Sequence, residues 1–175
     1  MSGEFSRRSF LKYTALTAAA VAGAGLLSGC EHGSNPVLRE VPSTNTVLKV
    51  KATLNSAVYD AAGKTATYEL AVSNGRNSAL NIGYKNFTVT ADSYYAHMND
   101  KIKVVCNDHP SAQVKNGESA TYVITVTGLE LSGEDTAVFT FQPDVPEYTE
   151  YSASWELTAA QMVADDTTGS EETEA

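Results

Sequence analysis

The residues best suited to chemistry are a cysteine, two histidines and a methionine that lie close together in the sequence. His97-Met98 precedes Cys106, and His109 and Gln113 follow it. A thiolate and imidazoles, with a weak methionine or glutamine ligand, form the donor set of blue-copper sites. The Cys106–His109 loop could therefore hold copper and serve a metal-binding or redox function.

The same residues also have a simpler structural interpretation. Cys106 is in phase with Ile102 and Val104, so a strand would place its thiol on the core face, where it packs as a small apolar group. Blue-copper proteins take a second histidine from an earlier strand, and no histidine lies between His32 and His97. We therefore predict no metal site and no cofactor, and keep His97, Cys106 and His109 as the alternative metal ligands.

Two further groups of side chains could bind a ligand. Loop oxygen atoms could coordinate calcium, although their spacing matches no calcium motif and solvated turn residues are the simpler interpretation; the residues are Asp92, Asn99, Asp100, Asn107 and Asp108. Aromatic side chains could form a platform for a sugar or a protein; these are Tyr94, Tyr95, Tyr148, Tyr151 and Trp155. Trp155 is in phase with Ala153 and Leu157, which favours a core position instead.

Sequence motifs of catalysis are absent. The chain has no Gly-x-Ser-x-Gly, no His-Glu-x-x-His and no phosphate-binding glycine loop. Glu147, Glu150 and Glu156 could be imagined as paired catalytic carboxylates, but nothing in the sequence fixes their separation. We therefore predict that the protein is not an enzyme.

The N-terminal segment has the composition of a secretory signal. A basic head at Arg7, Arg8 and Lys12 precedes an uncharged stretch from Tyr13 to Gly29, which ends in small residues before Cys30. A retained transmembrane helix is the alternative. This stretch is shorter than the span of about 20 residues that crosses a bilayer. It is also only weakly apolar, because it is rich in Ala, Gly, Ser and Thr.

Two motifs in this segment resemble known export signals. Ser6-Arg7-Arg8-Ser9-Phe10-Leu11-Lys12 resembles the twin-arginine consensus, with Arg7 and Arg8 as the pair and Phe10 and Leu11 in their usual places. Leu27-Ser28-Gly29-Cys30 resembles the lipobox of bacterial lipoproteins. The lipobox resemblance implies a diacylglyceryl group on the Cys30 thiol and cleavage just before this residue.

Together the two resemblances imply partners and a location. During export the chain would meet the twin-arginine translocase and the lipoprotein-processing enzymes. Two or more acyl chains, such as palmitate, suffice for stable membrane attachment. We therefore expect a lipid anchor on Cys30 at the outer face of the cytoplasmic membrane, with an outer membrane as the alternative where the cell has one.

The charge of the exported part restricts its partners. The chain has 12 basic and 21 acidic residues, of which the leader to Gly29 holds three and one, so the remainder carries 9 and 20, a net charge of −11. Nucleic acids and anionic lipids attract basic patches, so this charge argues against both as partners. Lipidation of Cys30 would leave Cys106 as the one other cysteine, so we expect no intramolecular disulfide.

The remaining sequence predicts an all-β domain. Apolar residues alternate with polar ones in eight segments, which is typical of half-buried strands; the segments are 48–54, 68–72, 80–84, 87–91, 102–106, 122–126, 137–141 and 153–157. Turn residues such as Asn74-Gly75 and Asn116-Gly117 separate them. The pattern predicts a single β-sandwich of about 7–8 antiparallel strands, with a closed barrel as the alternative.

The chain therefore divides into four predicted parts. Residues 1–29 are the cleaved signal peptide, and residues 30–45 are the lipidated cysteine with a flexible linker. Residues 46–158 form the sandwich, and residues 159–175 form a disordered acidic tail. The linker would reach at most about 50 Å when fully extended.

Parts of the domain resemble the immunoglobulin-like, telokin-like domains of bacterial lipoproteins. The resemblance lies in Tyr68-Glu69-Leu70-Ala71-Val72-Ser73-Asn74, Asn86-Phe87-Thr88-Val89, Asn116-Gly117-Glu118-Ser119 and Phe139-Thr140-Phe141-Gln142-Pro143. That family is largely of unknown function and supplies no catalytic residues. We expect a non-catalytic binding or structural module of the cell envelope with a protein or glycan partner.

Overall fold

The alternating apolar segments form β-strands in the computed structural model, which describes residues 35–92, 96–108, 113–145, 148 and 151–163. The export signal and Cys30 lie outside these residues. The helices among the described residues are three short 3-10 helices: η1 (Tyr84–Asn86), η2 (Ala96–Lys101) and η3 (Ala159–Gln161). None of them is long and apolar enough to cross a membrane.

The larger sheet contains five strands in the order β2-β3-β4-β9-β7. Their bounds are β2 (Ser43–Val47), β3 (Val50–Asp60), β4 (Thr65–Asn74), β9 (Ser119–Thr127) and β7 (Lys103–Asp108). All neighbours are antiparallel. Strand β7 forms one edge of this sheet, and its register with β9 shifts between Cys106 and Asp108.

The second sheet contains four strands in the order β1-β11-β10-β6. Their bounds are β1 (Val37–Leu38), β11 (Ala153–Thr158), β10 (Thr136–Phe141) and β6 (Phe87–Asp92). Strand β1 runs parallel to β11, and the other neighbours are antiparallel. A small antiparallel pair, β5 (Leu80–Asn81) with β8 (Gln113–Val114), completes the strands of the described residues.

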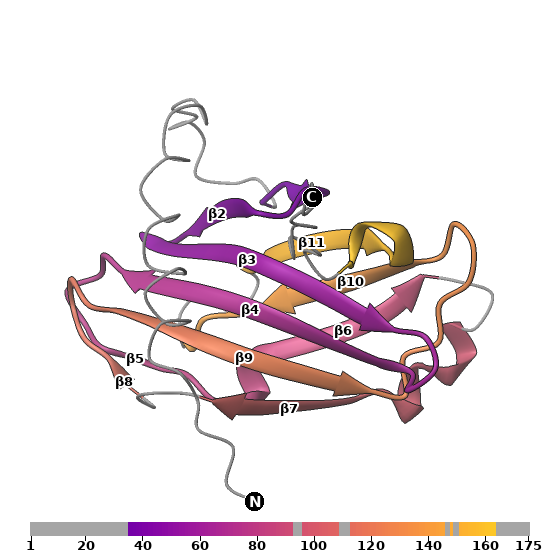
Figure 1. Ribbon diagram of the computed structural model, residues 1–175. Coiled ribbons are helices and arrows are strands. Elements are labelled where there is room, and N and C mark those ends of the chain that lie inside the picture. The colour runs from indigo at the N-terminus through magenta and orange to yellow at the C-terminus, as the bar shows by residue number, and fades with distance from the viewer. Residues whose placement is uncertain (1–34, 93–95, 109–112, 146–147, 149–150, 164–175) are drawn as a thin grey trace, which may run out of the picture. The chain divides into compact units, whose positions relative to one another are not determined.

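The strand order confirms the predicted immunoglobulin-like sandwich. Four consecutive neighbours β3-β4-β9-β7 and three neighbours β11-β10-β6 reproduce the two sheets of a constant-type immunoglobulin domain. The sheets are separate layers and not one closed sheet, which decides against the alternative architecture (Figure 1). The described part of the chain holds more strands than predicted, because short strands and the N-terminal segment add to this framework.

Aromatic side chains from both sheets fill the space between the layers. Tyr68 of β4 and Phe139 of β10 stack with their ring centroids 4.5 Å apart, and Trp155 of β11 lies 5.8 Å from Phe139. All three side chains are fully buried, as is Tyr122 of β9. The core position predicted for Trp155 is therefore correct, and the indole Nε1 donates a 2.9 Å hydrogen bond to Ser43 Oγ.

The predicted linker over residues 30–45 differs from the structure. Strand β1 pairs with β11, and most of β2 also lies in this range. The buried Asn45 side chain donates a 3.0 Å hydrogen bond to the carbonyl of Pro36, which ties the two segments together. The sequence composition did not predict this ordered segment. Strand β1 is held by backbone hydrogen bonds to the edge of a sheet, and such bonds need no pattern of apolar residues.

The strand predicted over residues 48–54 is interrupted at its start. Leu48 and Lys49 have φ values of 51° and 66° and form the two-residue turn between β2 and β3. Such turns normally use Asn or Gly because other residues are strained at positive φ. Gly75 supports the turn, since its amide donates a 2.9 Å hydrogen bond to Lys49 O, and a Cβ there would lie 2.7 Å from that oxygen.

The start of the predicted disordered tail is ordered. Helix η3 follows β11 directly, and Met162 after it is 1% exposed. The Met162 carbonyl accepts a 2.9 Å hydrogen bond from the backbone amide of Tyr59, and its sulfur lies 3.5 Å from Tyr68 Oη. Met162, in the segment after the last strand, therefore completes the core.

The loops of the sandwich lie at its two ends. We call the end at which the chain enters the sandwich the entry end, and the opposite one the far end. The entry end contains the turn 48–49, the loops 75–86 and 115–118, and the described residues 142–145, 148 and 151–152 of the loop between β10 and β11; the strand register places them together. The chain enters here, because Asn35 Nδ2 donates a 3.1 Å hydrogen bond to Ser152 O. The far end contains the segments 60–65, 96–102 and 127–136 together with Asp92 (Figure 1).

Candidate functional site

The structure places Cys106 on the core-facing side of β7. Its side chain is half-buried and packs against the core together with Ile102 and Val104, in the phase that the sequence predicts. The distances from Cys106 to its predicted metal partners are not defined. His97 belongs to η2, but its side chain is not among the described residues, and His109 lies outside them. Among described residues, no group of three or more His, Cys, Asp or Glu side chains could hold a metal ion.

The calcium candidates include one residue with a clear structural contact. The Asn99 side-chain amide pairs with the backbone of Ala91, because Oδ1 accepts from the amide at 2.9 Å and Nδ2 donates to the carbonyl at 3.3 Å. Asn99 thereby occupies the edge of β6 as a neighbouring strand would. Asp92 and Asp100 are exposed, and the side chains of Asn107 and Asp108 lie outside the described residues.

The candidate carboxylate and aromatic groups do not form one site. Glu156 makes an ion pair with Arg39 at 2.6 Å, whereas Glu147 and Glu150 lie outside the described residues, as do Tyr94 and Tyr95. Tyr148 and Tyr151 form an edge-to-face pair with centroids 5.9 Å apart in the loop between β10 and β11. Tyr148 is 40% exposed, so this pair offers a small aromatic surface at the entry end.

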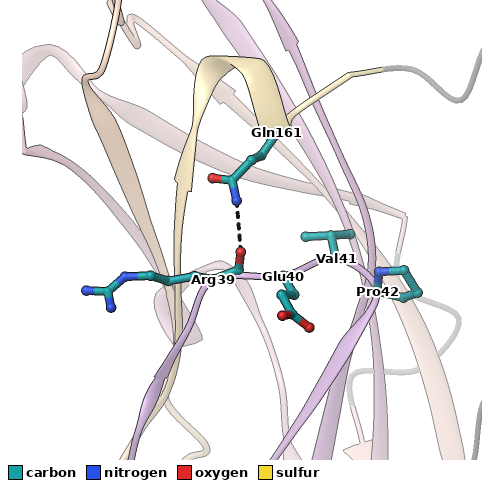
Figure 2. Close-up of a pocket in the computed structure, with 5 residues that line it drawn as sticks. All are labelled: Arg39, Glu40, Val41, Pro42 and Gln161. Carbon is teal, nitrogen blue, oxygen red and sulfur yellow. Dashed lines mark hydrogen bonds between the residues drawn. The ribbon is translucent and has the colours of Figure 1, made fainter.

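One pocket of about 460 Å³ lies where the chain crosses from β1 to β2. Arg39, Glu40, Val41 and Pro42 line it together with Gln161 of η3. Figure 2 shows Gln161 facing the Arg39 backbone, to whose carbonyl its Nε2 donates a 2.9 Å hydrogen bond. Gln161 Oε1 also accepts from the Thr158 amide at 2.9 Å. The polar groups of this pocket thus hold the crossing segment against the sandwich.

A second pocket of about 260 Å³ lies at the entry end between two loops. Its lining comes from Arg76, Ser78, Ala79, Leu80 and Asn81 of one loop and from Asp144 and Val145 of the other. Asp144 forms a 3.0 Å ion pair with Lys85. The Arg76 Nη1 donates to Leu48 O at 3.4 Å, whereas its Nε is buried without a hydrogen-bond partner in the described part of the chain.

Two buried asparagines fix the loops that form this pocket. Asn74 Nδ2 donates 2.9 Å hydrogen bonds to the carbonyls of Ser78 and Val114, and its Oδ1 accepts from the Arg76 amide at 2.9 Å. Asn86 Nδ2 donates at 2.8 Å to the Gln142 carbonyl. The sequence marks Asn74 as a turn residue but contains no signal that either side chain is a buried hydrogen-bonding centre.

Buried tyrosines carry the large pKa shifts of the described residues. Burial raises the pKa of Tyr122 to about 12, with a smaller contribution from the charge that Cys106 acquires as a thiolate. Burial also raises the pKa of Tyr68 above its usual value. Both phenols lie in the core and stay neutral at physiological pH, so these shifts report packing and not a reactive site.

Comparison with known proteins identifies the N-terminal segment. Residues 4–27 match the TAT (twin-arginine translocation) pathway signal sequence, whereas no curated protein matches the chain significantly. A solved structure, the secreted serine protease VesC from Vibrio cholerae, is similar to 63% of this chain at 11% identity and a TM-score of 0.41. The chain spans 23% of that protease, and a likeness of this size supports no functional argument.

The match confirms the predicted twin-arginine signal, which contains Arg7, Arg8, Phe10 and Leu11. The protein is therefore an exported protein whose signal engages the twin-arginine translocase and directs it across the cytoplasmic membrane. Its β-sandwich acts on the extracytoplasmic side.

Proposed function

We propose that this protein is a lipoprotein whose β-sandwich is held at the outer face of the cytoplasmic membrane by a lipid on Cys30. The supporting observation is the order of two motifs. The twin-arginine match ends at residue 27, and Leu27-Ser28-Gly29-Cys30 begins at that residue. A lipobox cysteine stands at the end of an export signal, because the processing enzymes act on the chain as it emerges from the membrane.

The exported domain acts in this proposal as a non-catalytic binding or structural module of the envelope. Its pocket polar groups already make structural contacts: Arg39 pairs with Glu156, Gln161 binds Thr158, and Asp144 pairs with Lys85. Groups engaged in this way support loop geometry and are poorly placed to transfer protons to a substrate. The partner is an envelope protein or a glycan.

Two variants test the export and anchoring steps separately. Cys30→Ala removes the acylated thiol, so the protein should lose a metabolically incorporated fatty-acid label and leave the membrane fraction while still being exported. Replacing Arg7 and Arg8 by lysine should instead keep the unprocessed chain inside the cell. Persistent label in Cys30→Ala would contradict the anchor, and Ser28→Thr serves as a matched control beside the cysteine.

A further inference from the structure

The point at which the chain enters the sandwich limits how far the domain can stand from a lipid on Cys30. Asn35 is bonded to Ser152 at the entry end, and four residues, 31–34, separate it from Cys30. Five extended steps reach at most about 18 Å. A 100-residue domain with a radius of gyration of about 13 Å is wider than that gap. A folded partner would therefore not fit between the entry end and the membrane.

The entry end differs in charge from the rest of this acidic domain. Its described loops carry four basic residues, Lys49, Arg76, Lys85 and Lys115, and two acidic ones, Glu118 and Asp144, which gives +2. Glu147 and Glu150 in the same loops lie outside the described residues and would bring the sum to zero.

The far end has the opposite character. Its described segments carry six acidic residues, Asp60, Asp92, Asp100, Glu130, Glu134 and Asp135, and two basic ones, Lys64 and Lys101, which gives −4. An anionic surface therefore repels the far end and does not repel the entry end.

The exposed tyrosines among the described residues also lie at the entry end. They are Tyr84 at 72% and Tyr148 at 40% exposure. Tyrosine favours the membrane–water interface because its ring is apolar and its hydroxyl is polar. Lysines next to exposed tyrosines are suited to contact with lipid headgroups.

We propose that the entry end docks on an anionic lipid surface, with Lys49, Lys85 and Lys115 against the headgroups and Tyr84 at the interface. The inference rests on the proposed lipid at Cys30, which supplies the short tether. Docking in this orientation directs the far end away from the membrane. The net negative charge of the exported chain argues against such attraction, but the fold separates the charges so that the tethered end escapes this repulsion.

The test compares two matched triple variants of the acylated chain in vesicles. Lys49→Glu/Lys85→Glu/Lys115→Glu changes the entry end, and Lys64→Glu/Lys101→Glu/Lys103→Glu changes lysines outside it; each triple includes one lysine from an exposed ion pair. Hydrogen–deuterium exchange is measured by mass spectrometry on phosphatidylglycerol and phosphatidylcholine vesicles. Urea unfolding midpoints confirm that both variants are folded.

On phosphatidylglycerol, the amides of residues 75–86 and 115–118 should exchange more slowly than on phosphatidylcholine, while residues 128–135 should not change. The entry-end triple variant should abolish this difference in exchange. Each lysine contributes about fivefold to lipid affinity, so the loss of three lowers the affinity by roughly 100-fold. The control triple should retain it. Equal exchange on both lipids, protection of residues 128–135, or an equal loss in the control triple would each overturn the proposal.

The failure of docking and the failure of lipidation are distinguishable. The mass of the N-terminal peptide from the membrane-extracted protein shows directly whether Cys30 is acylated. If it is not, the chain from Cys30 onward with Cys106→Ser is coupled through Cys30 to a maleimide lipid, and the same exchange experiment is done. Docking then stands or falls on the exchange pattern alone.

Discussion

Replacement of Met162 by alanine should strongly destabilise the domain, although this residue lies beyond the last strand. Its side chain is 1% exposed and its sulfur contacts Tyr68 Oη at 3.5 Å. Removing a buried methionine side chain costs about 2–5 kcal/mol, because the apolar contacts are lost and a cavity remains. A typical domain is stable by only about 5–15 kcal/mol, so the effect should be a large part of the total.

Deleting the chain after Thr158 should have at least the same effect. Such a deletion removes Met162 and also leaves the backbone amide of Tyr59 without the carbonyl that it contacts at 2.9 Å. That lost hydrogen bond adds about 1 kcal/mol. Deleting the chain after Val163 keeps both contacts and should be nearly silent.

Urea denaturation followed by tryptophan fluorescence measures these differences. With a slope of about 1–3 kcal/mol per molar urea, a loss of about 2–5 kcal/mol should lower the midpoint of Met162→Ala by about 0.7–5 M. Val163→Ala is the matched control, because that side chain is 64% exposed and exposed substitutions change stability by about 0.5 kcal/mol or less. Equal midpoints for Met162→Ala and the wild type would refute the docking of this segment.

Three other outcomes are expected. Trp155→Ala should cost about 3–5 kcal/mol in urea unfolding, and a loss below about 1 kcal/mol would contradict the buried indole. Cys106 should react slowly with iodoacetamide in the native state and quickly after denaturation; fast native alkylation that copper blocks would support the metal-binding alternative. Tyr122 should ionise near pH 12 in the native state and near 10.0 when unfolded, so its stabilising contribution is complete below pH 10 and is lost as the pH rises toward 12. Phenolate absorbance at 295 nm measures this ionisation in a pH titration. Tyr122→Phe should remove part of the absorbance increase near pH 12, and loss of part of the increase near pH 10.0 instead would contradict the assignment.

Alternating patterns predicted the long central strands well, because each buries one side chain in two. Strands β4, β9, β10 and β11 coincide with the segments around Tyr68, Tyr122, Phe139 and Trp155. Cys106 likewise lies on the face that its spacing predicts. In these places the local pattern and the tertiary packing agree.

Features that depend on distant contacts were not predictable. Leu48 and Lys49 form a turn that normally needs Asn or Gly, and contacts from Gly75 and Arg76 support it. The hydrogen bonds of Asn74 reach Val114, far along the sequence. A pattern of neighbouring residues contains no information about such partners, so these positions resemble ordinary polar loop residues.

The candidate site shows the same division. The export signal is a linear motif read by a receptor, so the sequence alone specifies it. The separation of charge between the two ends of the sandwich depends on which loops the fold brings together. The net charge of the exported chain argued against anionic lipid as a partner, whereas the described loops of the entry end carry +2 and those of the far end −4.

The lipid anchor can be measured as the mass of the N-terminal peptide of the protein, extracted from the membrane fraction of the cells that produce it. We expect this peptide to begin at Cys30 and to carry a diacylglyceryl group on the thiol. A peptide that begins at another residue, or an unmodified Cys30 in membrane-extracted protein, would contradict the lipid anchor.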